Sequence, residues 1–244
     1  MLLDWLAHEF VQQGWSLKRL HRLILTSTAW RQSSFREPDK NALDPDNRFY
    51  WRKSVIRLEA ESLRDRMLAA TNSLENTLYG PPLGVKEDDS GQFIVDGEQT
   101  RRSLYIRSRR SQPVGMLKAF DAPVMETNCE VRPVSTVATQ SLMLMNGEFI
   151  LKKSRQLAVR AVREVESLEE EPPLRRQITR VWQLAFCRQP SIHELQLAVE
   201  FHSNQLATME HADVELPEGV SKHDQALTNL CQGLLSSNEF MYVD

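Results

Sequence analysis

The segment IRLEAESLRDRMLAATNSL, residues 56–74, contains the most regular hydrophobic spacing in the 244-residue chain. Its apolar residues recur at intervals of four and three positions, a repeat that places side chains on one face of an α-helix. These residues are Ile56, Ala60, Leu63, Met67, Ala70 and Leu74. The spacing predicts a long amphipathic helix and, together with helical patterns on either side, a mainly α-helical protein.

The N-terminal residues predict a short antiparallel helix pair. Residues 2–13 place Leu2, Leu3, Leu6 and Phe10 near one helical face, and Gly14 ends the pattern. Ser16 is a typical N-cap for a second helix with Leu17, Leu20 and Ile24 at helical spacing. The first residues have no basic leader and form a helix from the start, so we expect the chain to be the C-terminal part of a longer protein. Residues 36–48 follow as a polar connection.

Residues from Thr136 to the C-terminus also predict helices. One helix spans about 136–164 with a break at Asn146–Gly147, and another covers about 174–189. The next begins with Ser191 and Glu194, the spacing of a capping box. The last spans about 222–240.

A small β insertion is predicted between these helical regions, at about residues 92–110. QFIVDG (92–97) and RRSLYIRSRR (101–110) are typical of two short strands in a hairpin, and a single helical turn ends before Pro123. In the second strand, Leu104 and Ile106 would point to the core and Ser103 to the opposite face. The predicted fold is a helical bundle with a small antiparallel β insertion, forming one domain. Its parts are the N-terminal helices (1–78), the β insertion with a motif loop (79–135) and the C-terminal helices (136–244).

Composition excludes several functional classes. The net charge of −3 gives no field that would attract nucleic acid, and no apolar run approaches a membrane span. Three widely separated cysteines form no CxxC or CxxCH, and the six histidines form no HExxH. The sequence therefore predicts no metal and no cofactor in this chain. Without a nucleophile elbow or phosphate-binding loop, it also commits the chain to no reaction.

The segment RLEAESLRD, residues 57–65, holds a pair of carboxylates on one predicted helix face. Glu61 and Asp65 are four residues apart, and such a pair, with Glu59 nearby, can divide acid and base roles or hold a cation. The structural alternative is that Arg57 and Arg64 neutralise the pair at helical spacing. The sequence favours the structural alternative, because ion pairs at this spacing are common in helices.

The strand predicted at 101–110 is the best candidate ligand surface. Arg107 and Arg109 beside Tyr105 can clamp a sulfate, phosphate or carboxylate group. The alternative is that these arginines pair with acidic residues, among them Glu87, Asp88 and Asp89.

The segment TNCEVRPVSTVATQSLMLMNGEF, residues 127–149, predicts an ordered loop followed by a buried helix. Arg132 precedes proline and is extended, and Ser135 or Thr136 can cap the helix. Apolar residues cover most of its circumference, so Gln140 would need hydrogen-bond partners, which we expect from the preceding loop. We expect Cys129 to be a buried inert thiol, since no base lies near it in sequence.

Five blocks of the chain, in order, resemble the PSD1 family, the planctomycete-type domain of unknown function DUF1553. They are LLDWLAHEFVQQGWSLKRLHRLILTSTAWRQSS, DPDNRFYWRKSVIRLEAESLRD, RRSLYIRSRRSQP, FDAPVMETNCEVRPVSTVATQSLMLMN and LLSSNEFMYVD. Members often have PQAL where this chain has Thr139-Gln140-Ser141-Leu142, so the glutamine is kept and the start of the helix differs.

The resemblance implies a context rather than a reaction. Such domains usually follow a DUF1549 domain, often with a c-type cytochrome domain, in exported periplasmic or cell-envelope proteins. Haem c would then belong only to an upstream domain. The resemblance supplies no catalytic residues.

Two main hypotheses follow. The leading one is a non-catalytic accessory domain that packs on an upstream DUF1549-like domain. The alternative is binding or processing of an anionic carbohydrate. The ligand residues of that alternative are Tyr105, Arg107, Arg109, Arg110 and Arg132. A closed polar cluster would favour the first hypothesis and an open pocket the second. The candidate members of such a cluster are Arg57, Glu59, Glu61, Arg64, Asp65, Asp121, Cys129, Gln140 and Asn146.

Overall fold

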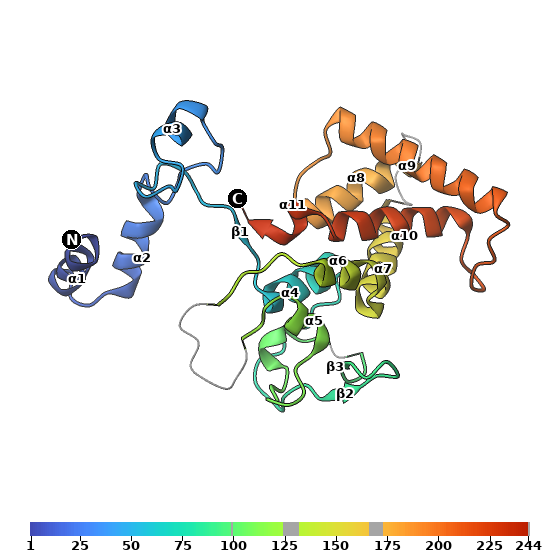
Figure 1. The fold of residues 1–244 in the computed structure, drawn as a ribbon, viewed down its shortest axis with the longest axis horizontal. Coiled ribbons are helices and arrows are strands. Elements are labelled where there is room, and N and C mark those ends of the chain that lie inside the picture. Colours follow the sequence, from blue (N-terminus) through green and yellow to red (C-terminus); the bar gives the residue numbers. More distant parts are fainter. Residues whose placement is uncertain (99, 124–131, 166–172, 244) are drawn as a thin grey trace. The chain divides into compact units, whose positions relative to one another are not determined.

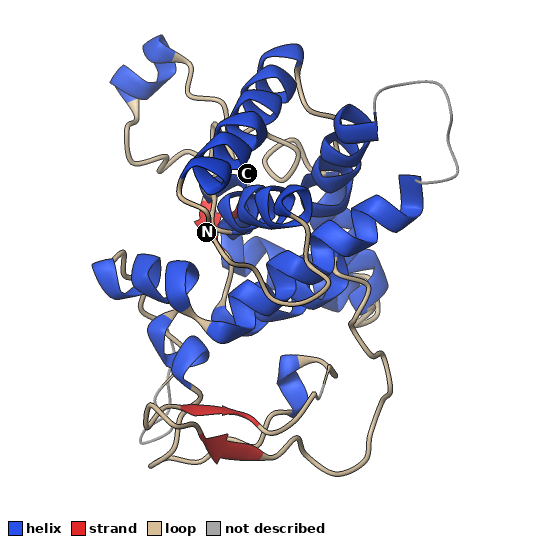
Figure 2. Cartoon of the chain, turned by 90° about the vertical axis from the view of Figure 1, so that its right-hand side faces the viewer, coloured by secondary structure: helices blue, strands red, loops and turns tan. Residues whose placement is uncertain are grey.

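The fold comes from a computed structural model that describes residues 1–98, 100–123, 132–165 and 173–243. Helices dominate the described residues, and their paired strands form two-stranded sheets (Figures 1 and 2). The predicted fold class, mainly α with a small β insertion, is confirmed. Contacts divide the chain into two compact units. One contains Met1–Ile56 and the C-terminal residues from Tyr242 on, and the other contains Arg57–Met241.

The first unit contains three short helices, α1 (Leu2–Gln12), α2 (Leu17–Thr26) and α3 (Pro38–Leu43). The α1–α2 pair and the Ser16 cap of α2 are as predicted, with the Arg19 N–H donating to the Ser16 hydroxyl at 3.4 Å. Helix α3 was not predicted, because it is a single short helix started by a proline within a polar segment. None of these three helices contains a buried residue.

Helix α4 (Ala60–Ala70) forms the middle of the periodic segment 56–74. Its predicted apolar face is buried, with Ala60, Leu63 and Met67 almost fully covered. The helix is shorter than predicted at both ends. Asn72 adopts a positive φ of 53°, which ends the helix before Leu74. Ile56 lies in strand β1 (Ile56–Arg57), which pairs with β4 (Tyr242–Val243).

The C-terminal helices of the second unit pack against one another (Figure 1). They are α6 (Ala138–Asn146), α7 (Glu148–Val165), α8 (Pro173–Phe186), α9 (Ile192–His211), α10 (Lys222–Leu235) and α11 (Asn238–Met241). Helix α7 packs against α8 and α10, and α9 covers α10 and α8. The predicted break at Gly147 is confirmed, and Ser191 and Glu194 form the predicted capping box that starts α9.

The β insertion is present but its second predicted strand is wrong. The hairpin is formed by β2 (Val85–Glu87) and β3 (Phe93–Val95), paired antiparallel. Residues 103–105 form a 3₁₀ turn, η1 (Ser103–Tyr105), instead of a strand. The reason is that the N–H and hydroxyl of Ser103 both donate to Asp65 at 2.7 Å. Ser103 is therefore buried and Leu104 exposed, the reverse of the predicted orientation.

Helix α6 is also less buried than its sequence predicts. Only Gln140 and Leu144 are buried, whereas Val137, Leu142 and Met145 are exposed. Helix α6 packs against α7 and the short helix α5 (Gly115–Ala119), the predicted single turn before Pro123. Because these neighbours cover one side, an apolar circumference does not make the helix buried all round.

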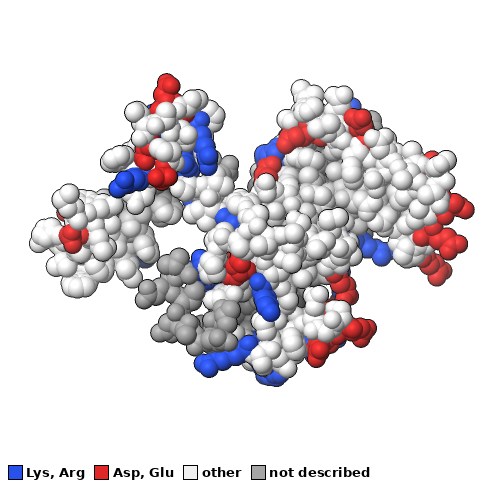
Figure 3. Space-filling view, in the orientation of Figure 1, with Lys and Arg blue, Asp and Glu red and all other residues white. Residues whose placement is uncertain are grey.

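The charged side chains are mixed in sign over the face seen in Figure 3, with much uncharged surface between them. This mixture agrees with the small net charge of −3. Within the described ranges, every helix falls short of the length and apolar character needed to cross a lipid bilayer.

Candidate functional site

A buried polar cluster, here the Arg57 cluster, joins four segments of the second unit. It consists of Arg57 at the end of β1, Asp121 after α5, Ser135 in the loop before α6 and Gln140 in α6. The Arg57 guanidinium donates to Asp121 Oδ2 at 2.5 Å, to Gln140 Oε1 at 3.3 Å and to the Ser135 carbonyl. The Arg57 side chain is 4% exposed and that of Asp121 16%. Arg57 and Gln140 are buried, whereas Asp121 and Ser135 are partly exposed, so the cluster is largely covered by the protein.

The remaining hydrogen bonds of the cluster hold the loop before α6. The N–H and hydroxyl of Ser135 both donate to Asp121 at 2.8 Å. The Gln140 amide donates to the carbonyls of Ala119 and Ser135 at 3.0 and 3.1 Å. The expectation that Gln140 finds partners in the preceding loop is confirmed. The predicted cap of α6 by Ser135 or Thr136 is wrong: the N-cap is Val137, and the Ser135 hydroxyl is already bound to Asp121.

The electrostatics of the cluster favour its charged form. Partial burial acts to raise the pKa of Asp121, but hydrogen bonds from Ser135 and Arg57 outweigh it and the pKa is lowered overall. The Arg57 guanidinium also lies 5.8 Å from the ring centre of Phe120, a buried residue. Its Nε atom is buried without an acceptor among the described residues. Most of the charge and hydrogen-bonding capacity of Arg57 is thus used inside the protein.

Of the three carboxylates around α4, Glu59 and Glu61 share Arg132, whereas Asp65 has other partners. Glu61 accepts from Arg132 at 2.7 Å, and Glu59 lies 3.4 Å from the same arginine. Asp65 accepts from Ser103 and lies 3.4 Å from Arg102 and 3.8 Å from Arg64, so the predicted pairing of Arg64 with these carboxylates is found at Asp65. The predicted pairing of Arg57 with Glu61 is wrong, because Arg57 precedes the helix and binds Asp121. No group of His, Cys, Asp and Glu side chains that could hold a metal ion is found in the described ranges.

The arginines of residues 101–110 have different environments. Arg101 is buried, donates to the carbonyl oxygens of Thr77, Tyr79 and Pro81, and lies 4.0 Å from the ring centre of Tyr105. The other three, Arg107, Arg109 and Arg110, are exposed. Arg109 donates to Gln112 at 2.7 Å, whereas Arg107 and Arg110 have no carboxylate partner within the described part of the chain.

Several predicted cluster members lie elsewhere. Arg64, in α4, is buried. Its guanidinium donates to the Arg101 carbonyl at 3.1 Å and to the Ser103 hydroxyl at 3.2 Å. Asn146 is exposed at the end of α6, and Arg132 lies beside Glu61 rather than near Arg107. Cys129 lies outside the described residues.

Sequence reasoning missed a second site, a pocket that contains the buried Lys153 of α7. Lys153 is 4% exposed and its ammonium donates to Ser73 at 2.9 Å and to Gln156 at 2.7 Å. A signal was present in the sequence: Lys153 lies on the apolar stripe of α7 that includes Ile150, Leu157 and Ala161. A lysine on such a stripe is unusual, because lysine is almost never fully buried.

The fold and the Arg57 cluster together define a mainly helical domain whose buried polar residues connect its loops to its core. Residues 1–202 match the sequence profile of PSD1, described as a protein of unknown function (DUF1553), and the chain belongs to this family. No curated protein matches the chain. No solved structure matches it either.

Proposed function

We propose that this chain is a non-catalytic accessory domain of an exported, cytochrome-linked multidomain protein, and that it docks on a DUF1549-like domain upstream. The observation that carries the proposal is the exposure of α1 and α2. These helices have apolar faces, yet neither contains a buried residue. The exposed large apolar residues of the two helices and of the turn between them are Leu2, Leu3, Trp5, Val11, Trp15, Leu17 and Leu25. We call this set the α1–α2 surface.

An apolar surface of this kind favours a protein partner. Monomeric soluble proteins rarely expose apolar patches of more than a few hundred Å² unless the patch binds something. Tryptophan is among the residues that contribute most to interfaces, and the set contains two. Isolated short helices are also marginally stable in water, so the pair gains stability from docking.

The non-catalytic part of the proposal rests on the Arg57 cluster. Its charged and polar groups bind one another and hold the loops at α5 and α6. A catalytic acid or base needs access to substrate, and the hydrogen-bonding capacity of Asp121 is largely taken up by Arg57 and Ser135. The same residues therefore serve the architecture of the domain in this proposal.

The docking proposal is tested by mixing this domain with the upstream DUF1549-like region and measuring affinity by calorimetry. We expect binding that the double substitution Leu3→Glu, Trp15→Glu weakens at least about 100-fold, since two buried apolar anchors are replaced by charges. The matched control is Ile192→Glu, which changes a 90% exposed residue of α9. An absence of binding by the unmodified domain would contradict the proposal. Self-association, measured by sedimentation, would instead assign the surface to a second copy.

A second candidate function is binding of an anionic carbohydrate, favoured by the exposed Arg107 and Arg110. Guanidinium groups without a carboxylate partner are available for bidentate contacts to sulfate or carboxylate groups. In this alternative, Tyr105 supplies an aromatic face and Arg109 a third cation, whereas Arg132 would have to leave Glu61. Binding to a sulfated polysaccharide should fall in the Arg107→Ala, Arg109→Ala double variant. It should persist in the exposed control pair Arg31→Ala, Arg36→Ala.

A further inference from the structure

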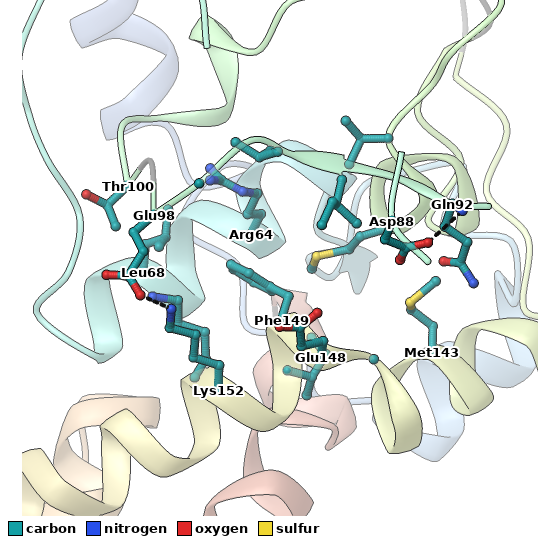
Figure 4. Close-up of a pocket in the computed structure, with 18 of the residues that line it drawn as sticks. Arg64, Leu68, Asp88, Gln92, Glu98, Thr100, Met143, Glu148, Phe149 and Lys152 are labelled. Carbon is teal, nitrogen blue, oxygen red and sulfur yellow. Dashed lines mark hydrogen bonds and ion pairs between the residues drawn. The ribbon is translucent and has the colours of Figure 1, made fainter. Parts of the chain in front are cut away.

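The pocket beneath the β2–β3 hairpin has a volume of about 210 Å³ and is mostly apolar inside (Figure 4). Its walls come from α4, the hairpin, α5, the end of α6 and the first turns of α7. The ring of Phe149 projects from α7 into its middle, and Met143 lies at one end. The apolar residues that line it are Leu68, Ile94, Val95, Val114, Met116, Met143, Phe149 and Ile150.

One end of the pocket is cationic. The Lys153 ammonium and the Arg64 guanidinium each lie 5.6 Å from the ring centre of Phe149. Both side chains are buried, with residue exposures of 4% and 3%. The acceptors found for Lys153 are the Ser73 hydroxyl and the Gln156 amide oxygen, both neutral. A buried ammonium is costly when no carboxylate compensates its charge.

The carboxylates of the pocket wall are engaged or exposed. Asp88 accepts from the N–H groups of Ser90 and Gln92 within its own turn, at 2.9 and 2.8 Å. Glu98 pairs with Lys152, the exposed neighbour of Lys153 (Figure 4). Glu148 is exposed at the start of α7. Arg64 lies 3.8 Å from Asp65, and the charge of Glu98 favours the protonated form of Lys153. The hydrogen-bond acceptors found for Lys153 among the described residues are nevertheless neutral.

Two further features favour an anion at this end. The first turn of α7 lines the pocket, and the N-terminus of a helix carries positive partial charge. Burial, followed by repulsion from Lys152 and Arg64, lowers the pKa of Lys153 to about 8. The negative charge of a bound anion would stabilise the protonated amine of Lys153 and so oppose this lowering of its pKa.

We propose that this pocket binds a small carboxylate with an apolar body, which accepts a hydrogen bond from Lys153 in the field of Arg64. The body packs on Phe149, Met116 and Met143. The volume is below the range of about 300–1,000 Å³ that is usual for drug-sized ligands, so the ligand is a short-chain or single-ring acid. This site is separate from the α1–α2 surface and does not depend on the docking proposal.

Hexanoate and benzoate are suitable probes, with hexanol and benzyl alcohol as neutral analogues. The experiment is a nuclear magnetic resonance titration of the unmodified protein with labelled methionine methyl groups. We expect saturable shifts of Met116 and Met143 with a Kd of about 0.1–1 mM, and no shift of Met209 in α9. The alcohols should bind at least about tenfold more weakly, because they cannot form the charged hydrogen bond.

Lys153→Met tests the cationic end directly. Hexanoate should then bind about tenfold more weakly or worse, while hexanol binding is unchanged. Arg155→Met is the control, because Arg155 is an exposed cation of the same helix that is not among the pocket-lining residues, and it should change hexanoate binding less than about twofold. If Lys153→Met does not fold, the comparison of acid with alcohol on the unmodified protein decides alone. Equal binding of acids and alcohols, or no saturable shift at Met116 and Met143, would overturn the proposal.

Discussion

Asp121 combines two demands at one position. It has a φ of 63°, in the left-handed region that aspartate tolerates better than most residues, and its carboxylate balances the buried Arg57. Removing one member of a buried ion pair leaves the other uncompensated, and this usually costs several kcal/mol. Asp121 is therefore the residue at which the Arg57 cluster is most sensitive.

Asp121→Ala should lower the free energy of unfolding by about 2–4 kcal/mol in urea denaturation. Asp213→Ala is the matched control, because Asp213 also has a positive φ, 45°, but is exposed. The control isolates the backbone effect. The difference between Asp121→Ala and wild type should shrink as pH falls below 3.8, since the folded pKa of Asp121 is lowered and its contribution is lost on protonation. Equal effects of the two substitutions would contradict a structural Arg57 cluster.

Lys153 makes a prediction for the alkaline pH range. Its folded pKa is about 8 against 10.5 for an ordinary lysine, so between these values the unfolded state binds the extra proton. Stability due to this group therefore rises with pH from about 8 to 10.5, by on the order of 2–3 kcal/mol. The groups acting on Lys153 are Lys152, Arg64 and Glu98, with Ser73 and Gln156 as acceptors.

Lys153→Met should be more stable than wild type at pH 7, and the difference should disappear by about pH 10.5. The measurement is chemical denaturation of both proteins across this range. Comparison of the two is needed because burial raises the pKa of the Cys231 thiol, which lowers the stability of both proteins above pH 9. A difference that is independent of pH would mean that Lys153 titrates normally.

At the residue scale, the sequence predicted hydrogen-bond partners correctly where those partners lie nearby in the chain. Gln140 was predicted to need partners from the preceding loop because it lies among apolar neighbours, and it has them. The partner of Arg57 was not predictable, because Asp121 lies 64 residues away and only the fold brings them together. Lys153 was missed for the same reason: its pocket is formed by segments distant in sequence.

At the scale of elements, α6 and α7 are separated at Gly147. Glycine is needed there because the Met143 carbonyl oxygen lies close to it, not because its backbone angles are unusual. Its φ is −68°, which any residue can adopt, but an added Cβ would lie 2.5 Å from the Met143 carbonyl oxygen. The sequence indicated the break correctly and for a different reason, the tolerance of Asn146 and Gly147 for left-handed φ. The steric reason becomes visible only when the two helices are in place.

Gly147→Ala should destabilise the domain by about 1–3 kcal/mol, because either Met143 or the backbone of α7 must move. Gly233→Ala in α10 is the matched control: nothing lies within 4 Å of its added Cβ, and alanine is the better helix former. The control should stabilise by roughly 0.5–1 kcal/mol. Thermal unfolding of both variants checks the two signs together, and a neutral Gly147→Ala would contradict the steric account.

Elements with complete local signals were predicted well. Ser191 and Glu194 satisfy each other at the start of α9, so the capping box needs no tertiary information. Residues 101–110 alternate like a strand, but Asp65 binds Ser103 and imposes a turn. Helix α6 is apolar all round, but its burial depends on how many neighbours pack on it. In both cases tertiary contacts overrode the local pattern.

At the scale of the whole molecule, the fold class followed from the periodicity of residues 56–74 and 136–240. Function did not follow, because the family is one of unknown function and only some of the predicted site residues meet in the Arg57 cluster. The α1–α2 surface is the exposed apolar surface on which our docking proposal rests. In our account, stability comes from the second unit and recognition from this surface.

Hydrogen–deuterium exchange tests this account most directly, with the domain alone and then mixed with the upstream DUF1549-like region. We predict protection around Arg57 and Gln140 in both states, since the backbone N–H groups of Leu58, Ser135 and Gln140 donate to Met241, Asp121 and Val137. On mixing, we predict that exchange slows in residues Leu2–Thr26. We expect no comparable slowing of exchange in any other part of the domain. Rapid exchange around Arg57 in the free domain, or no gain of protection in α1 and α2 on mixing, would contradict the account.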